Sequence, residues 1–399
     1  MERSNTKNKL FEGIRIVDFS NVVSGPMATQ ILADQGADVI KIESPENGDL
    51  TRMIGANRNG FSSMFAVLNR NKRSMVINIK SPKGQAVLNR LLLTADVLVQ
   101  NFRPGVMDKL GLGKTAVRKN FPSLIYMSIS GFGEVGPYSK RRVYDPVIQA
   151  ISGYASTQNP SHPDLIKNLI CDKVTALTAA QAISGALFAR ERDKNRDGEF
   201  VDLSMLDAGL AFLWPDGMMN NTLLGDAITP MPPLSDIYQI NETADGHITY
   251  LVVSDSEWVG LCQALEIPKM SNDSRFVDLI NRIKNIDELK SILKKEMVKW
   301  NTVEICDRLE EEDVPFAKIN SVSEVMTDPQ ILANSSIDRH KHPIAGDLQF
   351  PKHPASFEKR SSDVRLHAPS LGEHTRDILL ELELENSEIE NLYEDGSVA

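Results

Sequence analysis

The sequence contains little cysteine, and the cysteines that occur lie far apart. Cys171, Cys262 and Cys306 are an odd number at wide spacing, so they form neither a disulfide framework nor a zinc-ligand pattern. No stretch approaches the ~18 consecutive apolar residues of a transmembrane helix. The polar segment Met1–Leu10 carries no signal-peptide core. We therefore expect a cytoplasmic protein with no metal and no membrane partner.

The sequence also lacks a basic excess. Its 44 Lys and Arg residues are outnumbered by 54 Asp and Glu residues, which gives a net charge of -10. A nucleic-acid-binding surface needs positive charge to neutralise phosphates, so we expect no nucleic-acid partner. A local cluster of Lys and Arg can still bind a small anion. Hydrophobic residues make up 41%, which is typical of a globular chain, and 399 residues indicate more than one domain.

Short apolar runs alternate with helical patterns over the first 130 residues. Pro26–Gln35 and Pro82–Thr94 have helical patterns, and Ser81 precedes the second as an expected N-cap. Strands that alternate with helices predict parallel βαβ units and the α/β fold class. The runs are rich in Val and Ile and are bounded by turn residues, as buried strands are: Ile14–Phe19, Ala37–Glu43, Ser74–Ile79, Asp96–Phe102 and Leu124–Ser130.

The segments after these strands are polar or rich in Gly and Pro. Ligands of parallel sheets bind beyond the carboxyl ends of the strands, so a site is expected there. No Gly-x-Gly-x-x-Gly follows the first strand, which argues against a dinucleotide fingerprint and an NAD-dependent dehydrogenase. The segments are Ser20–Pro26, Glu43–Pro45, Asn101–Gly105 and Gly131–Pro137.

The second half of the chain predicts a smaller α+β domain. Gly225–Pro233 is a hinge rich in Gly and Pro, and Ser235–Ile240 and His247–Val253 are expected to form a hairpin around residues 243–246. Charged helices are expected at Asp287–Trp300 and Thr302–Glu312. We place the large domain at residues 1–224, the small domain at 225–336, and a linker with a returning C-terminal part at 337–399.

Several polar segments have both a functional and a structural interpretation. The Lys and Arg within Asn71–Ser74 precede a strand, where basic residues usually form a solvated rim. Arg103 follows a strand, and its guanidinium can bind phosphate together with amides of a helix beginning near Gly105. The Gly131–Gly136 loop is either a substrate-facing lid or a simple turn. The pair His340-x-His342 is too sparse for a metal site.

Asp172 is predicted to open a long helix, Asp172–Arg190, that precedes a strand at Phe200–Ser204. The simplest interpretation of Asp172 is an N-cap, worth ~0.5–2 kcal/mol, and catalysis is the alternative. Cys171 is a rival nucleophile because a helix N-terminus can lower a thiol pKa, although such a residue more often packs in the core. Asp145, after Tyr144, is expected as a second N-cap.

Taken together, these segments resemble the class III coenzyme A transferase family, which includes formyl-CoA and carnitine-CoA transferases and the α-methylacyl-CoA racemases. The similarity spans nearly the whole chain in the order of the family. It rests on Leu10–Asp18, Ser24-Gly25-Pro26, Gly36–Glu43, Gly48-Asp49, Asn71–Ser74, Asn101–Gly105, Gly131-Phe132-Gly133 and Leu371–Thr375.

The resemblance implies a large Rossmann-like domain built from both chain ends, a small domain, and a homodimer whose subunits interlock. It implies acyl-CoA and a carboxylic acid as substrates, without a permanently bound cofactor. Asp172 takes the position of the catalytic aspartate, and Tyr144, Asp145, Gly131 and Gly133 are expected to face the substrate. The implied coenzyme A pocket comprises Val23, Ser24, Ile77, Asn78, Lys80, Asn101, Phe102, Arg103, Lys109 and Arg142.

The implied activity is acyl-CoA:carboxylate CoA transfer through an aspartyl mixed anhydride and an aspartyl-CoA thioester at Asp172. The racemase branch has a His-Asp pair where this chain has Tyr144-Asp145, and a phenol does not readily replace imidazole as a base. This difference favours CoA transfer over racemisation. A racemase or epimerase remains the first alternative to a CoA-transferase, and a non-catalytic CoA-binding protein is the second. The glycine loop of formyl-CoA transferases is missing from residues 225–255, so formyl-CoA and oxalate are not favoured and the substrate acid stays open.

Overall fold

The structure, a computed structural model, describes residues 9–159, 161–233 and 238–399. The chain forms two compact units: the larger runs up to Pro215 and resumes at Ser335, and the smaller spans Asp216–Asn334. The sequence placed these boundaries after residues 224 and 336. None of the helices in the described part of the chain is both long enough and apolar enough to cross a membrane.

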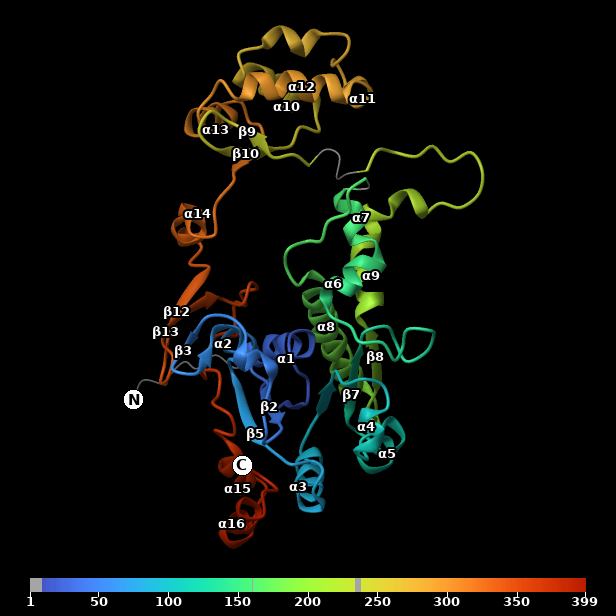
Figure 1. Cartoon of the computed structure of the whole chain (residues 1–399), viewed down its shortest axis with the longest axis vertical. Helices are drawn as coiled ribbons and strands as arrows, with labels where there is room; N and C mark the ends of the chain where they lie inside the picture. The colour runs from blue at the N-terminus through green and yellow to red at the C-terminus, as the bar shows by residue number, and fades with distance from the viewer. Residues whose placement is uncertain (1–8, 160, 234–237) are drawn as a thin grey trace. The chain divides into compact units, whose positions relative to one another are not determined.

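A six-stranded parallel sheet forms the centre of the larger unit (Figure 1). Its strands follow the order β5-β2-β1-β6-β7-β8, which is the doubly wound Rossmann order. The α/β class with a parallel sheet is therefore confirmed. The strands are β1 (Arg15–Asp18), β2 (Asp38–Glu43), β5 (Lys72–Val76), β6 (Val97–Gln100), β7 (Ile125–Ser130) and β8 (Phe200–Ser204).

Neighbouring residues of one strand point to opposite faces of this sheet, and both faces are covered. In β6, Val97 and Val99 pack against the helices α1 (Ser24–Asp34) and α8 (Ile170–Arg192), whereas Leu98 belongs to the core on the other face. All three side chains are fully buried. Burial on both faces is the reason why the strands are continuous apolar runs rather than alternating ones.

The end of the chain returns to cover the second face of the sheet. The helices α15 (Thr375–Glu381) and α16 (Asn386–Glu394) pack there beside α3 (Pro82–Leu92). α3 begins as expected: the Ser81 hydroxyl accepts the Gly84 amide at 2.9 Å. The large unit is therefore built from both ends of the chain.

Residues that were expected to form a linker after 337 instead contain a hairpin. β12 (Ile337–His342) pairs with β13 (Gly346–Pro351) in antiparallel register. The imidazole of His342 accepts the amides of Ile344 and Ala345 at 3.0 Å each and contacts the carbonyl of Ala368 at 2.9 Å. His342 therefore stabilises this turn, which accounts for one half of the His340-x-His342 motif.

The smaller unit is an α+β structure with its own core. A three-stranded antiparallel sheet, β9 (Asn241–Glu242), β10 (His247–Tyr250) and β11 (Phe316–Lys318), packs against helices. The expected turn at 243–246 is confirmed, but the strand before it is wrong in position: residues 238–240 are not a strand, and residues 235–237 lie outside the described residues. The helices of this unit include α10 (Asp255–Ala264), α11 (Leu279–Lys284), α12 (Ile286–Met297), α13 (Thr302–Glu311) and α14 (Pro329–Ala333).

The expectation that Asn71–Ser74 forms a solvated rim is wrong. Lys72 is fully buried, and its Nζ lies 3.0 Å from Oδ2 of Asp18 and 2.9 Å from the carbonyl of Pro26. The Asn71 side chain donates to Asp34, also buried, at 2.7 Å. A Lys at the start of β5 is tolerated in the interior because a buried carboxylate neutralises it.

Candidate active site

The candidate site lies where the winding of the sheet reverses, between β1 and β6. The chain leaves β1 toward the face that carries α1, and it leaves β6 toward the opposite face. The two connecting loops therefore diverge at the carboxyl ends of the strands and leave a crevice. A cavity of about 240 Å³ occupies this position. It is lined by residues 21–24, 101–104, 129–131, 139 and 141–144, together with Asp172 and Met205.

Asp172 lies in this cavity as the third residue of α8, not as its N-cap. α8 begins at Ile170, and the residue before it, Leu169, makes no capping bond with its side chain. The carboxylate of Asp145 instead accepts the Asp172 amide at 3.0 Å. Asp145 was expected to cap its own helix, α6 (Asp145–Ser152), but is the first helical residue after Tyr144. The carboxylate of Asp172 therefore does not cap α8.

The pKa of the Asp172 carboxyl group lies far above its ordinary value. Burial, followed by the neighbouring charge of Asp145, raises its pKa to about 7, against the opposing effect of hydrogen bonds from the Ser24 hydroxyl and amide. The residue is 9% exposed and faces the cavity. A carboxylate with a raised pKa is poorly stabilised by solvent and is correspondingly more basic and more nucleophilic.

Cys171, the rival nucleophile, is fully buried. Burial, with the charges of Asp145 and Asp172, raises the pKa of this thiol to about 12. A thiol with this pKa is protonated at neutral pH and is a poor nucleophile. The interpretation of Cys171 as a core residue is confirmed.

The loop after β1 is held in a strained conformation beside Asp172. Val22 has a φ of 70°, which is rare for a β-branched residue and costs about 1–3 kcal/mol. Asn101 stabilises the loop by accepting the Asn21 amide and donating to the Asn21 carbonyl, both at 2.8 Å. The Val22 amide donates to Oδ1 of Asp49 at 3.3 Å. These bonds fix the start of α1 and hence Ser24, which binds Asp172.

A group of buried charges lies beneath the same loop. The Nζ of Lys41 donates to the carbonyl of Ser20 at 2.8 Å and pairs with Oδ2 of Asp49 at 2.8 Å. Burial by itself would raise the pKa of the Asp18 carboxyl group. The positive charges of Lys72 and Lys41 outweigh this effect and lower the pKa to about 2. Because these charges are paired within the protein, they present a fixed set of acceptors and donors to the loop.

Exposed arginines give the cavity positive charge. Arg103, Arg141 and Arg142 all line it. Among the described residues that line it, Asp172 is the only acidic one. As expected, a short helix, α4 (Val106–Lys109), follows Gly105, whose φ of 84° suits a glycine. Guanidinium groups bind phosphate through paired N–H donors, so this rim can hold a phosphorylated ligand.

Comparison with known proteins agrees with this geometry. Residues 11–375 match the model of CoA-transferase family III. The chain belongs to this family. The succinate–glutarate CoA-transferase of Agrobacterium fabrum is 33% identical over 394 residues, covering 93% of this chain and 95% of that protein. The human (Homo sapiens) succinyl-CoA:glutarate CoA-transferase is 32% identical over 383 residues, covering 94% and 86%.

A solved structure shares the fold. The crystal structure of a CAIB/BAIF family protein from Brucella suis has a TM-score of 0.82 and 30% sequence identity, covering 94% of this chain and 100% of that one.

The formyl-CoA:oxalate CoA-transferase of Shigella sonnei is 31% identical over 405 residues, covering 95% of this chain and 97% of that protein. The chain is thus an enzyme of the class III CoA-transferases.

The structure of this CoA-transferase brings most of the expected site residues together. The following line the cavity: Val23, Ser24, Asn101, Phe102, Arg103, Gly131, Arg142, Tyr144 and Asp172. Asp145 lies behind Asp172 and is buried. Gly133 is outside the lining, and its amide donates to the Ser130 hydroxyl at 3.0 Å.

Four residues of the expected coenzyme A pocket do not line the cavity. Ile77, Asn78 and Lys80 follow β5, which is the edge strand on the far side of β2. The side chain of Ile77 is 1% exposed and packs in the core, where its backbone bridges to Val398. Lys109 ends α4 and is exposed. Their place in ligand binding stays a prediction.

Sequence reasoning missed several residues that line the cavity, among them Arg141, Ser130 and Met205. Two of them had a usable signal. Ser130 ends β7 and Met205 follows β8, so both lie at carboxyl ends of predicted strands. Arg141 had no such signal, because the sequence from Gly136 to Val143 has no periodic pattern. Among the residues that the structure describes, no group of three His, Cys, Asp or Glu side chains is placed to hold a metal ion.

Proposed function

We propose that this enzyme moves coenzyme A between carboxylic acids and that Asp172 is its nucleophile. One observation carries the proposal: the carboxylate of Asp172 faces the cavity, does not cap its own helix α8, and has a pKa raised to about 7 by burial and by Asp145. A structural carboxylate at a helix N-terminus has its pKa lowered instead.

In the proposed first step, the ionised Asp172 attacks the thioester carbonyl of acyl-CoA. The C–S bond breaks, CoA leaves as a thiolate, and an acyl–aspartyl anhydride remains. The thiolate then attacks the aspartyl carbonyl and expels the first acid as a carboxylate, leaving an aspartyl-CoA thioester. The acceptor acid repeats both steps in reverse and leaves as a new acyl-CoA, which regenerates Asp172. Covalent catalysis divides one difficult exchange into easier ones.

Ser24 is the proposed donor to the oxygen that becomes negative. Its hydroxyl and amide already bind the carboxylate of Asp172 at the first turn of α1. When the aspartyl group is acylated, attack on its carbonyl places negative charge on an oxygen at the same position, where these donors and the α1 N-terminus stabilise it. The Gly133 amide in the neighbouring loop is already bound to the Ser130 hydroxyl, so it is not part of this proposed donor set.

The exposed arginines favour anionic groups on both substrates, the acyl-CoA and the carboxylic acid. We propose that Arg103 and Arg142 bind phosphates of coenzyme A while Phe102 packs against its apolar part. A third cation, Arg141, remains for the carboxylate of the acid. Relatives are named for succinate, glutarate and oxalate, and we propose short dicarboxylic acids as the first class to test.

The proposed assembly is an interlocked homodimer in the cytoplasm. Light scattering should give twice the 44.3 kDa of one chain. Two differently tagged preparations should not exchange subunits without unfolding if the chains are linked. Rapid exchange at native pH would contradict interlocking while leaving the chemistry untouched.

The test of the chemistry is to trap the intermediate. The enzyme is incubated with succinyl-CoA, treated with hydroxylamine or borohydride, digested, and examined by mass spectrometry. A modification on the peptide that contains Asp172 supports the proposal, and turnover that survives Asp172→Ala contradicts it. Deuterium exchange at the α-carbon of an acyl-CoA without an acceptor acid would favour a racemase instead, for which Tyr144, 64% exposed, is a poor base.

A further inference from the structure

Three arginines line the cavity beside Asp172, and one of them differs from the others. Arg103, Arg141 and Arg142 are all exposed. Of these three, Arg141 is the one whose guanidinium lies over an aromatic ring of the described part of the chain: its Cζ is 3.9 Å from the centre of the Tyr138 ring. Stacking uses the face of a guanidinium and fixes its plane, while the N–H groups at its edge stay available to a ligand.

The ring beneath Arg141 is itself held in place. Tyr138 is half-buried and meets Phe132 edge to face, with the ring centres 5.8 Å apart and the planes at 68°. Aromatic pairs of this geometry stabilise each other beyond the area that they bury. The Tyr138 carbonyl also accepts the Arg141 amide at 2.9 Å. The backbone and the side chain of Arg141 are therefore both fixed to the same residue.

The segment that carries Arg141 is anchored at the end of β7. Val143 packs against Gly131, where a Cβ atom would lie 2.3 Å from Cγ1 of Val143, so a residue with a side chain would not permit this approach. The Gly131 carbonyl accepts the amide of Leu206, which follows β8, at 3.1 Å. Arg141 comes two residues before Val143 in the sequence, so its backbone is held at the carboxyl end of the sheet, where the cavity lies.

The charge of Arg141 is not neutralised by the acid of the same loop. Within the described part of the chain, the Arg141 guanidinium forms no ion pair and no hydrogen bond. Glu134 lies in the same loop but pairs at 2.9 Å with Lys114, the first residue of α5 (Lys114–Asn120). Lys114 also pairs with Asp202 of β8 at 2.6 Å. Arg141 thus presents a positioned and unpaired cation to the cavity.

A positioned guanidinium suits a second carboxylate of the reacting acid. One carboxylate must reach Asp172 for transfer, and a second one that stays ionised is costly to bring into the cavity without a cation. The fork of N–H groups matches a carboxylate and binds it through two hydrogen bonds. An acid of the same length that ends in a methyl group leaves the guanidinium without a partner, which is unfavourable as well.

We propose that Arg141, stacked on Tyr138, selects the acid substrate by binding the carboxylate that does not react, so that the enzyme prefers dicarboxylic acids to monocarboxylic acids of equal length. Arg141 determines specificity, and Tyr138 is a positioning residue. The inference rests on the proposed transfer at Asp172 but assigns the selection of the acid to a group outside that chemistry. It applies to the donor as well, because succinyl-CoA carries the same free carboxylate.

The test compares glutarate with pentanoate, which have equal carbon chains but differ by one carboxylate. With the full-length enzyme at saturating succinyl-CoA, kcat/KM should be at least about a hundredfold higher for glutarate. Arg141→Gln should raise KM for glutarate about a hundredfold, keep kcat within about threefold and leave pentanoate nearly unchanged, because the lost interaction is with the far carboxylate. A parent enzyme that uses both acids equally, or an Arg141→Gln enzyme that retains the preference, would overturn the proposal.

Two comparisons show whether the effect comes from the stacked guanidinium. Arg142→Gln makes the same change at the neighbouring exposed arginine and should raise KM for succinyl-CoA while the preference for glutarate stays. Tyr138→Leu removes the ring and should weaken the preference about tenfold, whereas Tyr138→Phe retains the ring and should preserve it. Equal preferences in Tyr138→Leu and Tyr138→Phe would contradict the proposal, since the ring would then not position Arg141.

A separate measurement distinguishes failure of this inference from failure of the proposed transfer. Arg141→Gln, incubated with saturating succinyl-CoA and trapped, should still carry a modification on the peptide that contains Asp172. If this adduct forms and the preference for glutarate is unchanged, Arg141 does not select the acid, while transfer at Asp172 stands. If neither the parent nor the variant forms the adduct, the proposed transfer is wrong, and this inference fails with it.

Discussion

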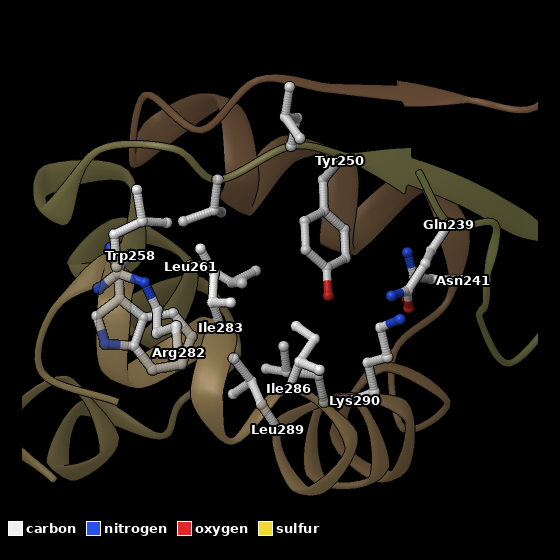
Figure 2. Close-up of a pocket in the computed structure, with 14 residues that line it drawn as sticks. Gln239, Asn241, Tyr250, Trp258, Leu261, Arg282, Ile283, Ile286, Leu289 and Lys290 are labelled. Carbon is white, nitrogen blue, oxygen red and sulfur yellow. The ribbon is translucent and has the colours of Figure 1, made fainter. Parts of the chain in front are cut away.

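The two units of this chain build a cavity in opposite ways. In the larger unit, the cavity beside Asp172 rests on buried charges that are all paired, such as Lys41 with Asp49 and Lys72 with Asp18. In the smaller unit, the cavity beside Trp258 is walled mostly by apolar side chains (Figure 2), and Arg282 and Lys290 are the charged residues among those that line it. Chemistry on a carboxylate needs fixed dipoles, and these need a buried polar scaffold, whereas an aliphatic pocket needs only space between well-packed elements.

The largest expected effect separates the two cavities by function. Asp172→Ala should lower kcat for CoA transfer by about ten-thousand-fold or more, because the nucleophile is gone. A larger side chain at the cavity of the smaller unit, as in Leu279→Trp, should leave kcat for short acids within about twofold. Steady-state kinetics with succinyl-CoA measures both, and circular dichroism verifies that each variant is folded.

The buried charges should matter far more than exposed ones. Lys41→Met leaves Asp49 without its partner in the interior and should lower the free energy of unfolding by about 3–5 kcal/mol. The matched variant Lys299→Met removes a Lys of the smaller unit that is 61% exposed and pairs with Glu296, and should cost about 0–1 kcal/mol. Urea unfolding at pH 7 compares them. Similar losses would mean that the Lys41 pair does not support the loop.

The raised pKa of Asp172 should appear as a pH-dependent stability. Its folded pKa of about 7 lies above the ordinary 3.8, so the folded state retains the proton longer, and stability falls as pH rises from about 4 to 7. Above pH 7 this penalty approaches about 4 kcal/mol. Asp172→Asn removes it, so the variant should be more stable than the parent at pH 8 and increasingly similar to it toward pH 4. A gain that is independent of pH would contradict the raised pKa.

The smallest expected effect concerns the loop beside the nucleophile. Asn101→Ala removes both partners of the Asn21 backbone and should lower stability by about 1–3 kcal/mol and kcat about tenfold, because Ser24 is then less well positioned. Asn285→Ala is the control in the smaller unit, where this side chain also donates to two backbone carbonyls, each at 2.9 Å. It should lose stability alone. A tenfold loss of kcat in Asn285→Ala would show that the effect is not specific to the loop.

Local sequence signals predicted the elements better than their ends. The strands β1, β2, β6 and β7 and the Ser81 cap follow from apolar runs and turn residues, which act over a few residues. The strand before the turn at 243–246 was misplaced, because β9 has only the two residues Asn241–Glu242 and no periodicity can reveal so short a strand. The hairpin β12–β13 was missed because its polar strands pair with each other rather than facing a large core.

The residues of the candidate site were likewise predicted only in part. Asp172, Ser24 and Asn101 were expected from the resemblance, and the structure places all three at one cavity. The burial of Lys72 was not predictable, because a basic residue before a strand is normally solvated and only its partner Asp18, 54 residues away in the chain, makes its burial possible.

The sequence alone determined the alternation of strands and helices over the first 130 residues, the acidic character of the chain, and the polar segments at the carboxyl ends of the strands, since each depends on neighbouring residues. The tertiary structure decided which carboxylate caps α8 and which one faces the cavity. Asp145 and Asp172 are both acids at the start of a helix, and no local pattern distinguishes them. Only folding places Asp145 against the Asp172 amide and leaves the second carboxylate desolvated, because burial and charge are properties of the packed chain.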